Sequence, residues 1–310
     1  MTVTSWPACR NASYGSWNSE SSKSAARTHA ILMSHLLHLP PYERFEQTSL
    51  LVAASIFEPT GDGRFVATGA ALSPWSDESL HGSPVAMLLA RQVESVPAEQ
   101  AMFVTRMTVE LLRAFGRVPV EVRSRIVRPG RKVQIVEASL WNGEQEVARA
   151  TALRMRTSDV SVPEEPEDHP HDPPESLQTW AGGWRPGAEA YHLIGVENRS
   201  PADFEEPGPH FSWFRLRVPL IPGEEPTGLI RVCAAADFPN GISRVVDPRQ
   251  ISFVNPDVTL YLHRHPVDEW VMVDGRTWLE PNGVGVAEGA LYDRRGRIGR
   301  SLQSLLVEPR

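Results

Sequence analysis

The stretch FVNPDVTLYLHRHP, residues 253–266, places a carboxylate where it could act on a substrate. Val258, Leu260 and Leu262 alternate with other residues, which is typical of a half-buried strand. Asp257 heads this strand directly after a proline. A carboxylate in such a position can accept a proton from a water molecule, but Asn-Pro-Asp is also ordinary turn material. The residues alone leave both interpretations open.

A second group of candidates lies where a helix is expected to begin. The segment SPVAMLLARQVES, residues 83–95, has apolar residues at helical spacing, with Ser83 as the expected cap and Pro84 in the first turn. Backbone N–H groups around Gly82 and Ser83 would stabilise a developing negative charge, because a helix N-terminus presents donors and a positive dipole end. His81 could bind substrate or support the helix entrance.

Two histidine pairs invite a metal interpretation that the sequence does not favour. His263 and His265 share one face of a strand without a third ligand nearby, and His169 and His171 lie in an acidic, proline-rich stretch. Metal ligands need a rigid surrounding shell, which such a stretch does not supply. The sequence also lacks a G-x-S-x-G motif, which argues against an α/β-hydrolase with a serine nucleophile.

Composition limits the classes of partner. The chain has 310 residues, a net charge of −7 and a pI near 5.8, which argues against a general nucleic-acid binder. Local arginines could still bind an anionic small molecule. No apolar run reaches the roughly 18–20 residues needed to span a bilayer, and the two cysteines, Cys9 and Cys233, lie far apart. We therefore expect a cytoplasmic protein without a disulfide framework.

Four segments are expected from composition. Residues 1–44 begin with a polar stretch rich in Ser and Asn and are predicted to be a largely disordered extension. Residues 158–180 are a predicted linker, because five prolines and seven acids within 158–176 exclude a helix or a central strand. Residues 45–157 and 181–310 are the two predicted domains.

The two predicted domains are related by a repeat with an offset of 151 residues. EASLWNGEQEVARATALRMR, residues 137–156, aligns without a gap on EGALYDRRGRIGRSLQSLLV, residues 288–307. The same offset aligns FVTRMTVELLRAF with VNPDVTLYLHRHP, and therefore Thr108 with Thr259. One register that holds over two separated blocks indicates a tandem duplication.

Each half shows the same order of expected elements: two strands, one apolar helix and a long antiparallel meander. The helices are expected at 83–95 and 226–238, and a hairpin is expected at Asn142–Gly143. A curved sheet wrapped around one buried helix is the hotdog fold, so the predicted fold class is α+β, a double hotdog. The expected strands are 48–59, 64–73, 101–114, 118–128, 132–141 and 145–156 in the first half, and 188–198, 210–220, 250–264, 268–279, 283–293 and 297–307 in the second.

Three stretches resemble the TesB-like, type II acyl-CoA thioesterases, whose chains are double hotdogs. SPWSDESLHGSPVAMLLARQVE, residues 73–94, resembles the N-terminal helix segment of that family. NPDVTLYLHRHPVDEWVMVDGRT, residues 255–277, and GALYDRRGRIGRSLQSLLVE, residues 289–308, resemble its C-terminal hotdog. The resemblance spans roughly residues 45–308. It implies hydrolysis of acyl-CoA to a free fatty acid and CoA, with no metal or redox cofactor.

The resemblance also implies a set of site residues. In that family an Asp, a Thr or Ser and a Gln of the second hotdog hold the attacking water, and the matching motifs place these roles on Asp257, Thr277 and Gln303. The offset of 151 sets Arg106 against Asp257 and Ala152 against Gln303, so the first half lacks both polar groups. The substrate-binding residues expected at the helix entrance are His81, Gly82 and Ser83.

Two other functions remain open at this point. Hotdog folds also host acyl-thioester hydratases and dehydratases, which usually rely on a His with an acid, and His81 keeps that alternative open. A non-catalytic acyl-CoA-binding protein is the third interpretation, because a fold does not fix a function. The expected partner is acyl-CoA in each case, with neither nucleic acid nor a membrane span, and association into a homo-oligomer is compatible with the fold.

Overall fold

The first half of the chain folds into two short strands, one long helix and four long strands. The computed structural model describes residues 54–163, 171–180 and 189–310, so the predicted extension, residues 1–44, lies outside the described residues. The elements of the first half are β1 (Phe57–Pro59), β2 (Arg64–Ala67), the 3-10 turn η1 (Gly69–Ala71), α3 (Gly82–Ser95), β3 (Met102–Glu110), β4 (Val120–Arg128), β5 (Val133–Asn142) and β6 (Gln145–Arg156). The hairpin between β5 and β6 turns at Gly143, whose φ of 61° suits glycine.

The second half repeats this order with additional short elements. Its elements are η2 (Pro174–Ser176), β7 (Gln178–Thr179), the helical turn η3 (Tyr191–Gly195), β8 (Val196–Ser200), β9 (His210–Leu216), α4 (Gly228–Ala236), α5 (Pro239–Ile242), β10 (Ile251–Val254), β11 (Asp257–Leu262), β12 (Val271–Glu280), β13 (Val284–Asp293) and β14 (Gly296–Pro309). Helix α4 begins at a Thr227 cap, whose side chain accepts the N–H of Ile230 at 3.2 Å.

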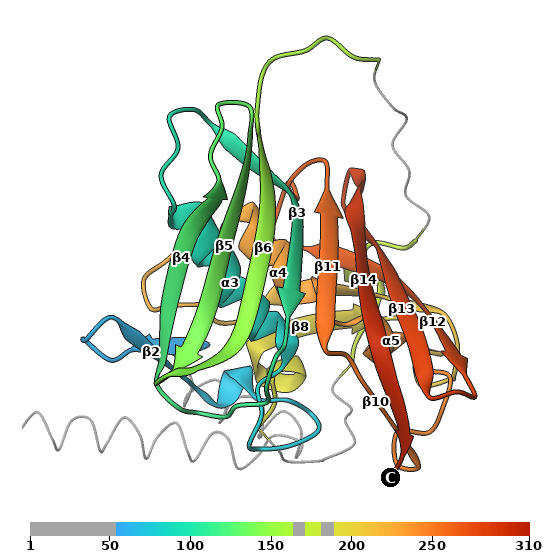
Figure 1. Ribbon diagram of the computed structural model, residues 1–310. Helices are drawn as coiled ribbons and strands as arrows, with labels where there is room; N and C mark the ends of the chain where they lie inside the picture. The colour runs from blue at the N-terminus through green and yellow to red at the C-terminus, as the bar shows by residue number, and fades with distance from the viewer. Residues whose placement is uncertain (1–53, 164–170, 181–188) are drawn as a thin grey trace, which may run out of the picture. The chain divides into compact units, whose positions relative to one another are not determined.

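One antiparallel sheet of 14 strands joins the two halves of the described chain. Its order is β1-β2-β4-β5-β6-β3-β11-β14-β13-β12-β9-β8-β7, and β10 pairs with β14 outside this path. Figure 1 shows β3 and β11 side by side at the middle of the sheet. Thr108 lies directly opposite Thr259 in this pair, and their hydroxyl groups are 3.1 Å apart. The two residues that the sequence repeat equates therefore meet where the halves join, which confirms the double hotdog.

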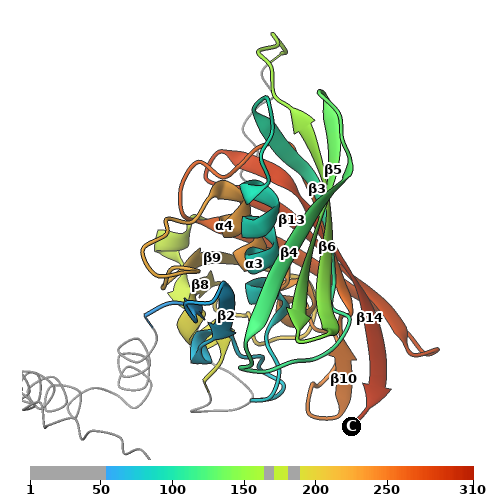
Figure 2. The ribbon, with the colours of Figure 1, turned by 60° about the vertical axis from the view of Figure 1, so that its left-hand side comes forward.

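Both long helices lie against the same face of the sheet, as Figure 2 shows for α3 and α4. Val85, Leu88, Leu89 and Val93 of α3 are almost fully buried, which explains their helical spacing. Helix α4 is apolar on nearly every side because it packs against α3 as well as against β9 and β12. Among the described helices, none has the length and apolar character needed to cross a membrane.

Several expected boundaries are corrected by the structure. Helix α3 begins at Gly82 and its cap is His81 rather than Ser83. Part of the expected strand 188–198 is the helical turn η3, so strand β8 starts only at Val196. The expected strand 64–73 ends at Ala67 and continues into η1.

Two further segments differ from the prediction, one because of a proline and the other because of a strand pairing. The expected strand 250–264 is divided into β10 and β11 around Pro256, which cannot donate to a sheet ladder. The predicted linker, 158–180, contains the short strand β7 at its end, which pairs with β8. The linker composition therefore excluded long elements but not a two-residue edge strand.

Candidate active site

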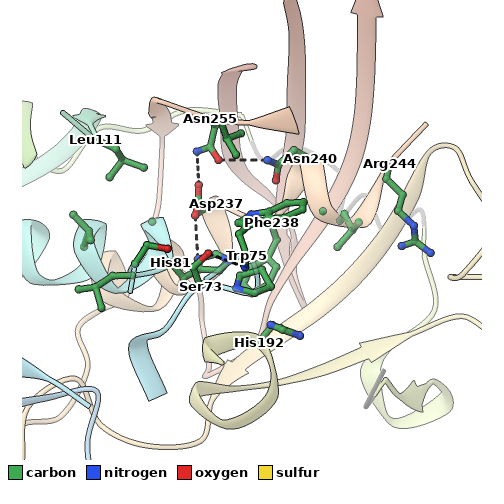
Figure 3. Close-up of a pocket in the computed structure, with 18 of the residues that line it drawn as sticks. Ser73, Trp75, His81, Leu111, His192, Asp237, Phe238, Asn240, Arg244 and Asn255 are labelled. Carbon is green, nitrogen blue, oxygen red and sulfur yellow. Dashed lines mark hydrogen bonds and ion pairs between the residues drawn. The ribbon is translucent and has the colours of Figure 1, made fainter. Parts of the chain in front are cut away.

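A pocket with a volume of about 460 Å³ lies beside the N-terminus of α3 and the C-terminus of α4. This volume is in the usual range for small-molecule sites. Exposed residues such as Arg113, Val254 and Leu306 line one part of the pocket, which is its rim. Buried residues such as His192 and Phe214 line the inner end. Figure 3 shows Asp237 in the middle of the labelled side chains.

Asp237 is the only acid among the described residues that line this pocket. It caps the C-terminus of α4 and is 5% exposed. Its Oδ1 accepts a hydrogen bond from Asn255 Nδ2 at 2.7 Å and another from Gln303 Nε2 at 2.8 Å. Hydrogen bonds to an ionised carboxylate are stronger than those between neutral groups. The two amides therefore fix the orientation of the Asp237 carboxylate.

His81 contacts the other oxygen of this carboxylate. Its Nδ1 lies 3.0 Å from Asp237 Oδ2 and also 3.1 Å from the backbone nitrogen of Ser83. One ring nitrogen cannot donate to a carboxylate and accept from an amide at the same time. Among the described residues only the His81 ring contacts Oδ2 as a side-chain donor, and an unpaired oxygen of a buried carboxylate costs more free energy than an unpaired N–H at a helix end. We therefore assign the proton to Nδ1, with Asp237 as its acceptor.

Gly82 lets the start of α3 approach the carboxylate closely. A Cβ atom at this position would lie 2.5 Å from Asp237 Oδ2 and 2.9 Å from its Cγ, far inside ordinary contact distance. The first N–H groups of a helix have no acceptor within the helix. The N-terminus of α3 therefore presents backbone donors and a positive dipole end beside Asp237 Oδ2.

Asn240 closes a hydrogen-bonded ring around these groups. Its backbone N–H donates to Gln303 Oε1 at 3.2 Å, and its Nδ2 donates to Asn255 Oδ1 at 3.3 Å. Asp237, Gln303, Asn240 and Asn255 are thus linked in a ring, with short helix α5 supplying Asn240. Such a ring orients both amides so that their N–H groups point at the carboxylate.

Asp257 lies outside this network. Thr259 is opposite Leu302 in the pairing of β11 with β14, which brings Asp257 next to Ser304. The backbone N–H of Ser304 donates to Asp257 Oδ1 at 2.8 Å. Successive strand residues point to opposite faces of a sheet, so Gln303 faces the side opposite to Asp257. The structure does not bring Asp257 and Gln303 together, and Asp257 is not among the pocket-lining residues.

Thr277 faces the same side of the sheet as Gln303 but at a distance. Thr277 is opposite Ala287, and Ala287 is opposite Gln303, so one strand separates the two residues by roughly 10 Å. The Thr277 hydroxyl group is 2.7 Å from that of Ser243, which donates to Pro239 O at 2.7 Å. Thr277 therefore supports α5 rather than the pocket itself.

Of the three residues expected at the helix entrance, two line the pocket and one does not. His81 and Gly82 line the pocket and contact or adjoin Asp237. Ser83 is fully buried, does not line the pocket, and supplies the N–H that lies near His81. Of the six predicted site residues, the structure therefore brings His81, Gly82 and Gln303 together around one carboxylate.

Sequence reasoning missed Asp237, Asn240 and Asn255. A signal for Asp237 was present, because it is the only charged residue between Arg231 and Arg244 in an otherwise apolar helical run. Burying a single acidic side chain at the end of a helix costs free energy unless the carboxylate has hydrogen-bond donors. Asn255 lies two residues before Asp257, in the same Asn-Pro-Asp turn.

Burial dominates the electrostatics of Tyr191, whose ring lies 5.0 Å from that of His81, and of His192, which lines the pocket. The Tyr191 hydroxyl group donates to Ala234 O at 2.9 Å, and complete burial, with the nearby Asp237, raises the pKa of Tyr191 well above its usual value. Burial, with a smaller effect of His81, lowers the pKa of His192 to about 3. His192 is therefore neutral near pH 7.

Comparison with known proteins places both halves in one family. Residues 71–155 match the model of the acyl-CoA thioesterase N-terminal domain, and residues 162–307 match that of the acyl-CoA thioesterase C-terminal domain. The two matches together cover most of the chain. Comparison with curated proteins gave no match.

Solved structures show the same fold at low sequence identity. A hotdog-fold protein of unknown function from Alicyclobacillus acidocaldarius has a TM-score of 0.64 at 15% identity, over 83% of this chain and 96% of that one. A tesB protein of Mycobacterium avium subsp. paratuberculosis has a TM-score of 0.61 at 16% identity, over 85% of this chain and 100% of that one. Acyl-CoA thioesterase II TesB2 of Mycobacterium marinum has a TM-score of 0.57 at 15% identity, over 82% and 96%.

The duplicated hotdog, the sheet that joins its halves and the two domain matches point to one conclusion. The chain belongs to the acyl-CoA thioesterase family whose members combine these N-terminal and C-terminal domains.

Proposed function

We propose that this protein hydrolyses acyl-CoA thioesters and that Asp237 is the base that activates the attacking water. One observation carries the proposal: the buried Asp237 carboxylate lines an otherwise largely apolar pocket, between two amide donors and the N-terminus of α3. Membership of the acyl-CoA thioesterase family supports the same class of substrate.

The two carboxylate oxygens have different surroundings, which suggests where the water binds. Oδ1 is occupied by the donors of Asn255 and Gln303, whereas Oδ2 lies beside His81 and Gly82 at the start of α3. A water molecule bound to Oδ2 would donate one hydrogen to the carboxylate. Asp237 accepts that proton while the water oxygen bonds to the thioester carbonyl carbon.

The N-terminus of α3 would then stabilise the negative charge that this attack creates. The carbonyl oxygen becomes an oxyanion, and the backbone N–H of Gly82 and the positive end of the helix dipole are the groups that would stabilise it. When the carbon–sulfur bond breaks, the oxyanion electrons restore the carbonyl group. The sulfur leaves as the thiol of CoA with the proton that Asp237 accepted, so the carboxylate is regenerated.

Burial suggests how the substrate lies in the pocket. The exposed Arg113 at the rim is suited to the phosphates of CoA, because a guanidinium group binds phosphate through two hydrogen bonds. At the inner end the lining includes Phe204 and Phe214, which would contact the acyl chain. The thioester then lies between them, next to Asp237.

The test is thiol release from a series of acyl-CoAs of increasing chain length. Asp237→Asn keeps the shape of the side chain but removes the base, so we expect turnover to fall about a hundredfold or more. Asp257→Asn is the matched control, because it makes the same change on the other face of the sheet and should stay within about threefold of wild type. Circular dichroism and thermal unfolding would establish that both variants fold. Wild-type turnover in Asp237→Asn would refute the assignment.

The contact between His81 and Asp237 favours one alternative reaction. A His paired with an acid at 3.0 Å is the arrangement expected of a hotdog hydratase, which adds water across the double bond of an enoyl thioester. A hydratase removes the ultraviolet absorbance of a conjugated enoyl-CoA without releasing thiol. A hydrolase releases thiol from saturated acyl-CoAs as well. Binding of acyl-CoA without either change would indicate a non-catalytic acyl-CoA-binding protein.

A further inference from the structure

Two polar side chains at the inner end of the pocket have buried atoms without a hydrogen-bond partner. These atoms are His192 Nδ1 and Asn198 Oδ1, and neither has a partner within the described part of the chain. His192 is 8% exposed and Asn198 is 3% exposed, and both residues line the pocket. Buried polar atoms in folded proteins are nearly always paired, so two unpaired atoms in one pocket need an explanation.

The surroundings of these atoms are apolar and aromatic. His192 belongs to η3, and its ring lies 5.7 Å from that of Trp180. Asn198 lies on β8 opposite Phe214, which also lines the pocket. Figure 3 shows His192 at the edge of the group of labelled side chains, beyond Trp75 and Phe238. A polar group in this apolar end would find these two side chains as its partners.

Other buried polar groups of the same region do have hydrogen-bond partners. Ser200 and Ser212 are both buried, and their hydroxyl groups are 2.9 Å apart. The Ser212 hydroxyl group also lies 3.2 Å from Arg199 O. Among the buried polar side chains that line this end of the pocket, Ser212 is therefore paired, whereas His192 and Asn198 each keep one unpaired atom.

The charges at this end favour an uncharged ligand group. Burial keeps His192 neutral near pH 7, because it lowers its pKa to about 3. Arg244, which also lines the pocket, has a partner, since its Nη2 lies 2.8 Å from Glu205 Oε2. A carboxylate at the end of an acyl chain would find no free cation among the described lining residues of this inner end. An uncharged polar group fits better.

We infer that the pocket selects acyl groups that carry a hydroxyl group, which hydrogen-bonds to His192 and Asn198. The inference rests on the proposed hydrolysis of acyl-CoA at Asp237 and specifies the substrate class. A hydroxyl group donates one hydrogen bond and accepts others, so it can serve the amide oxygen and the imidazole together. A plain hydrocarbon chain would offer neither atom a hydrogen-bond partner. A site built to bind a substrate hydroxyl group discriminates against the analogue that lacks it.

The test compares dodecanoyl-CoA with a series of hydroxydodecanoyl-CoAs in which the hydroxyl group moves along the chain. We expect kcat/KM, measured by thiol release, to be about tenfold or more higher for at least one hydroxy isomer than for dodecanoyl-CoA. His192→Phe and Asn198→Leu should each reduce this ratio about tenfold, because each removes one partner of the hydroxyl group. Ser200→Ala is the matched control on strand β8, since Ser200 is buried and paired but does not line the pocket. Its ratio should equal that of wild type.

Several results would overturn the inference. A ratio near one for every isomer, or a preference that survives in both variants, would show that these atoms do not contact the acyl chain. An equal loss for dodecanoyl-CoA and its hydroxy isomers would mean that they bind the CoA arm instead. Calorimetric binding of free hydroxydodecanoic acids against dodecanoic acid gives a readout without turnover. If no acyl-CoA is hydrolysed, the proposed function fails, but preferential binding of the hydroxy acids would still support the selectivity.

Discussion

Replacement of Gly82 by alanine tests how closely α3 and Asp237 approach each other. In most helices this change stabilises the protein by up to about 1 kcal/mol, because alanine is the better helix former. Here the new Cβ would lie 2.5 Å from Asp237 Oδ2 and 3.0 Å from Oδ1. Ordinary contact between such atoms requires about 1 Å more, so the carboxylate or the start of the helix must shift.

The size of the effect follows from the partners of the carboxylate. A shift of about 1 Å would lengthen the hydrogen bonds from Asn255 and Gln303, now 2.7 and 2.8 Å, beyond their useful range. A hydrogen bond to a charged group contributes about 1.5–3 kcal/mol. Losing one of them corresponds to roughly a ten- to hundredfold fall in kcat/KM, since 1.4 kcal/mol is a factor of ten. We expect Gly82→Ala to lower both stability and turnover by amounts of this order.

A double-mutant cycle identifies the cause. Urea unfolding would be measured for wild type, Gly82→Ala, Asp237→Ala and the double variant. Asp237→Ala removes the atoms that the new Cβ would meet, so Gly82→Ala should be neutral or slightly stabilising in that background. An equal loss of stability in both backgrounds would refute the reasoning, because the cost would then arise elsewhere than at the carboxylate. Acyl-CoA turnover of Gly82→Ala alone completes the comparison.

Two further predictions concern His192 and Thr277. The pKa of His192 in the folded protein is about 3, whereas an unfolded His titrates near 6.5, so the unfolded state binds the extra proton as the pH falls through this window. The stability that His192 contributes is thus complete above about pH 6.5, and the free energy of unfolding falls by about 2 kcal/mol at pH 5. In urea unfolding, the His192→Phe variant should therefore lose less stability between pH 7 and pH 5 than the wild type. An identical pH dependence of the two proteins would contradict the assignment. Thr277→Val removes the contact with Ser243 but leaves the bond from Ser243 to Pro239, so we expect a stability loss of about 1 kcal/mol and a fall in turnover of less than tenfold. A hundredfold fall in thiol release from that variant would instead support a direct catalytic role for Thr277.

Much of the fold follows from the sequence because repetition and periodicity are local signals. The offset of 151 residues aligned Thr108 with Thr259, and the structure places these residues directly opposite each other. The helical spacing within 83–95 predicted a buried helix, and the structure begins it one residue earlier. The predicted boundaries were wrong where tertiary contacts decide the backbone, as at His81, which contacts Asp237, and at the helical turn Tyr191–Gly195.

The site was harder to predict because it joins residues from four separate segments. The alternation of Val258, Leu260 and Leu262 places Asp257 on the face of the strand opposite to the core. Gln303 could be recognised because it interrupts an apolar strand on the buried face. The acid beside it could not, since Asp237 is 66 residues away in sequence.

The amino-acid sequence by itself determined that an ancestral unit was doubled, how its copies align and which strand faces are apolar. These properties depend on the order and spacing of the residues, which are the same in the unfolded chain. Only the tertiary structure decided which carboxylate meets Gln303 and His81, because packing brings the end of α4 against the start of α3 and the inner face of β14. Contacts between distant segments depend on how helices and sheet fit together, and no local pattern encodes that fit.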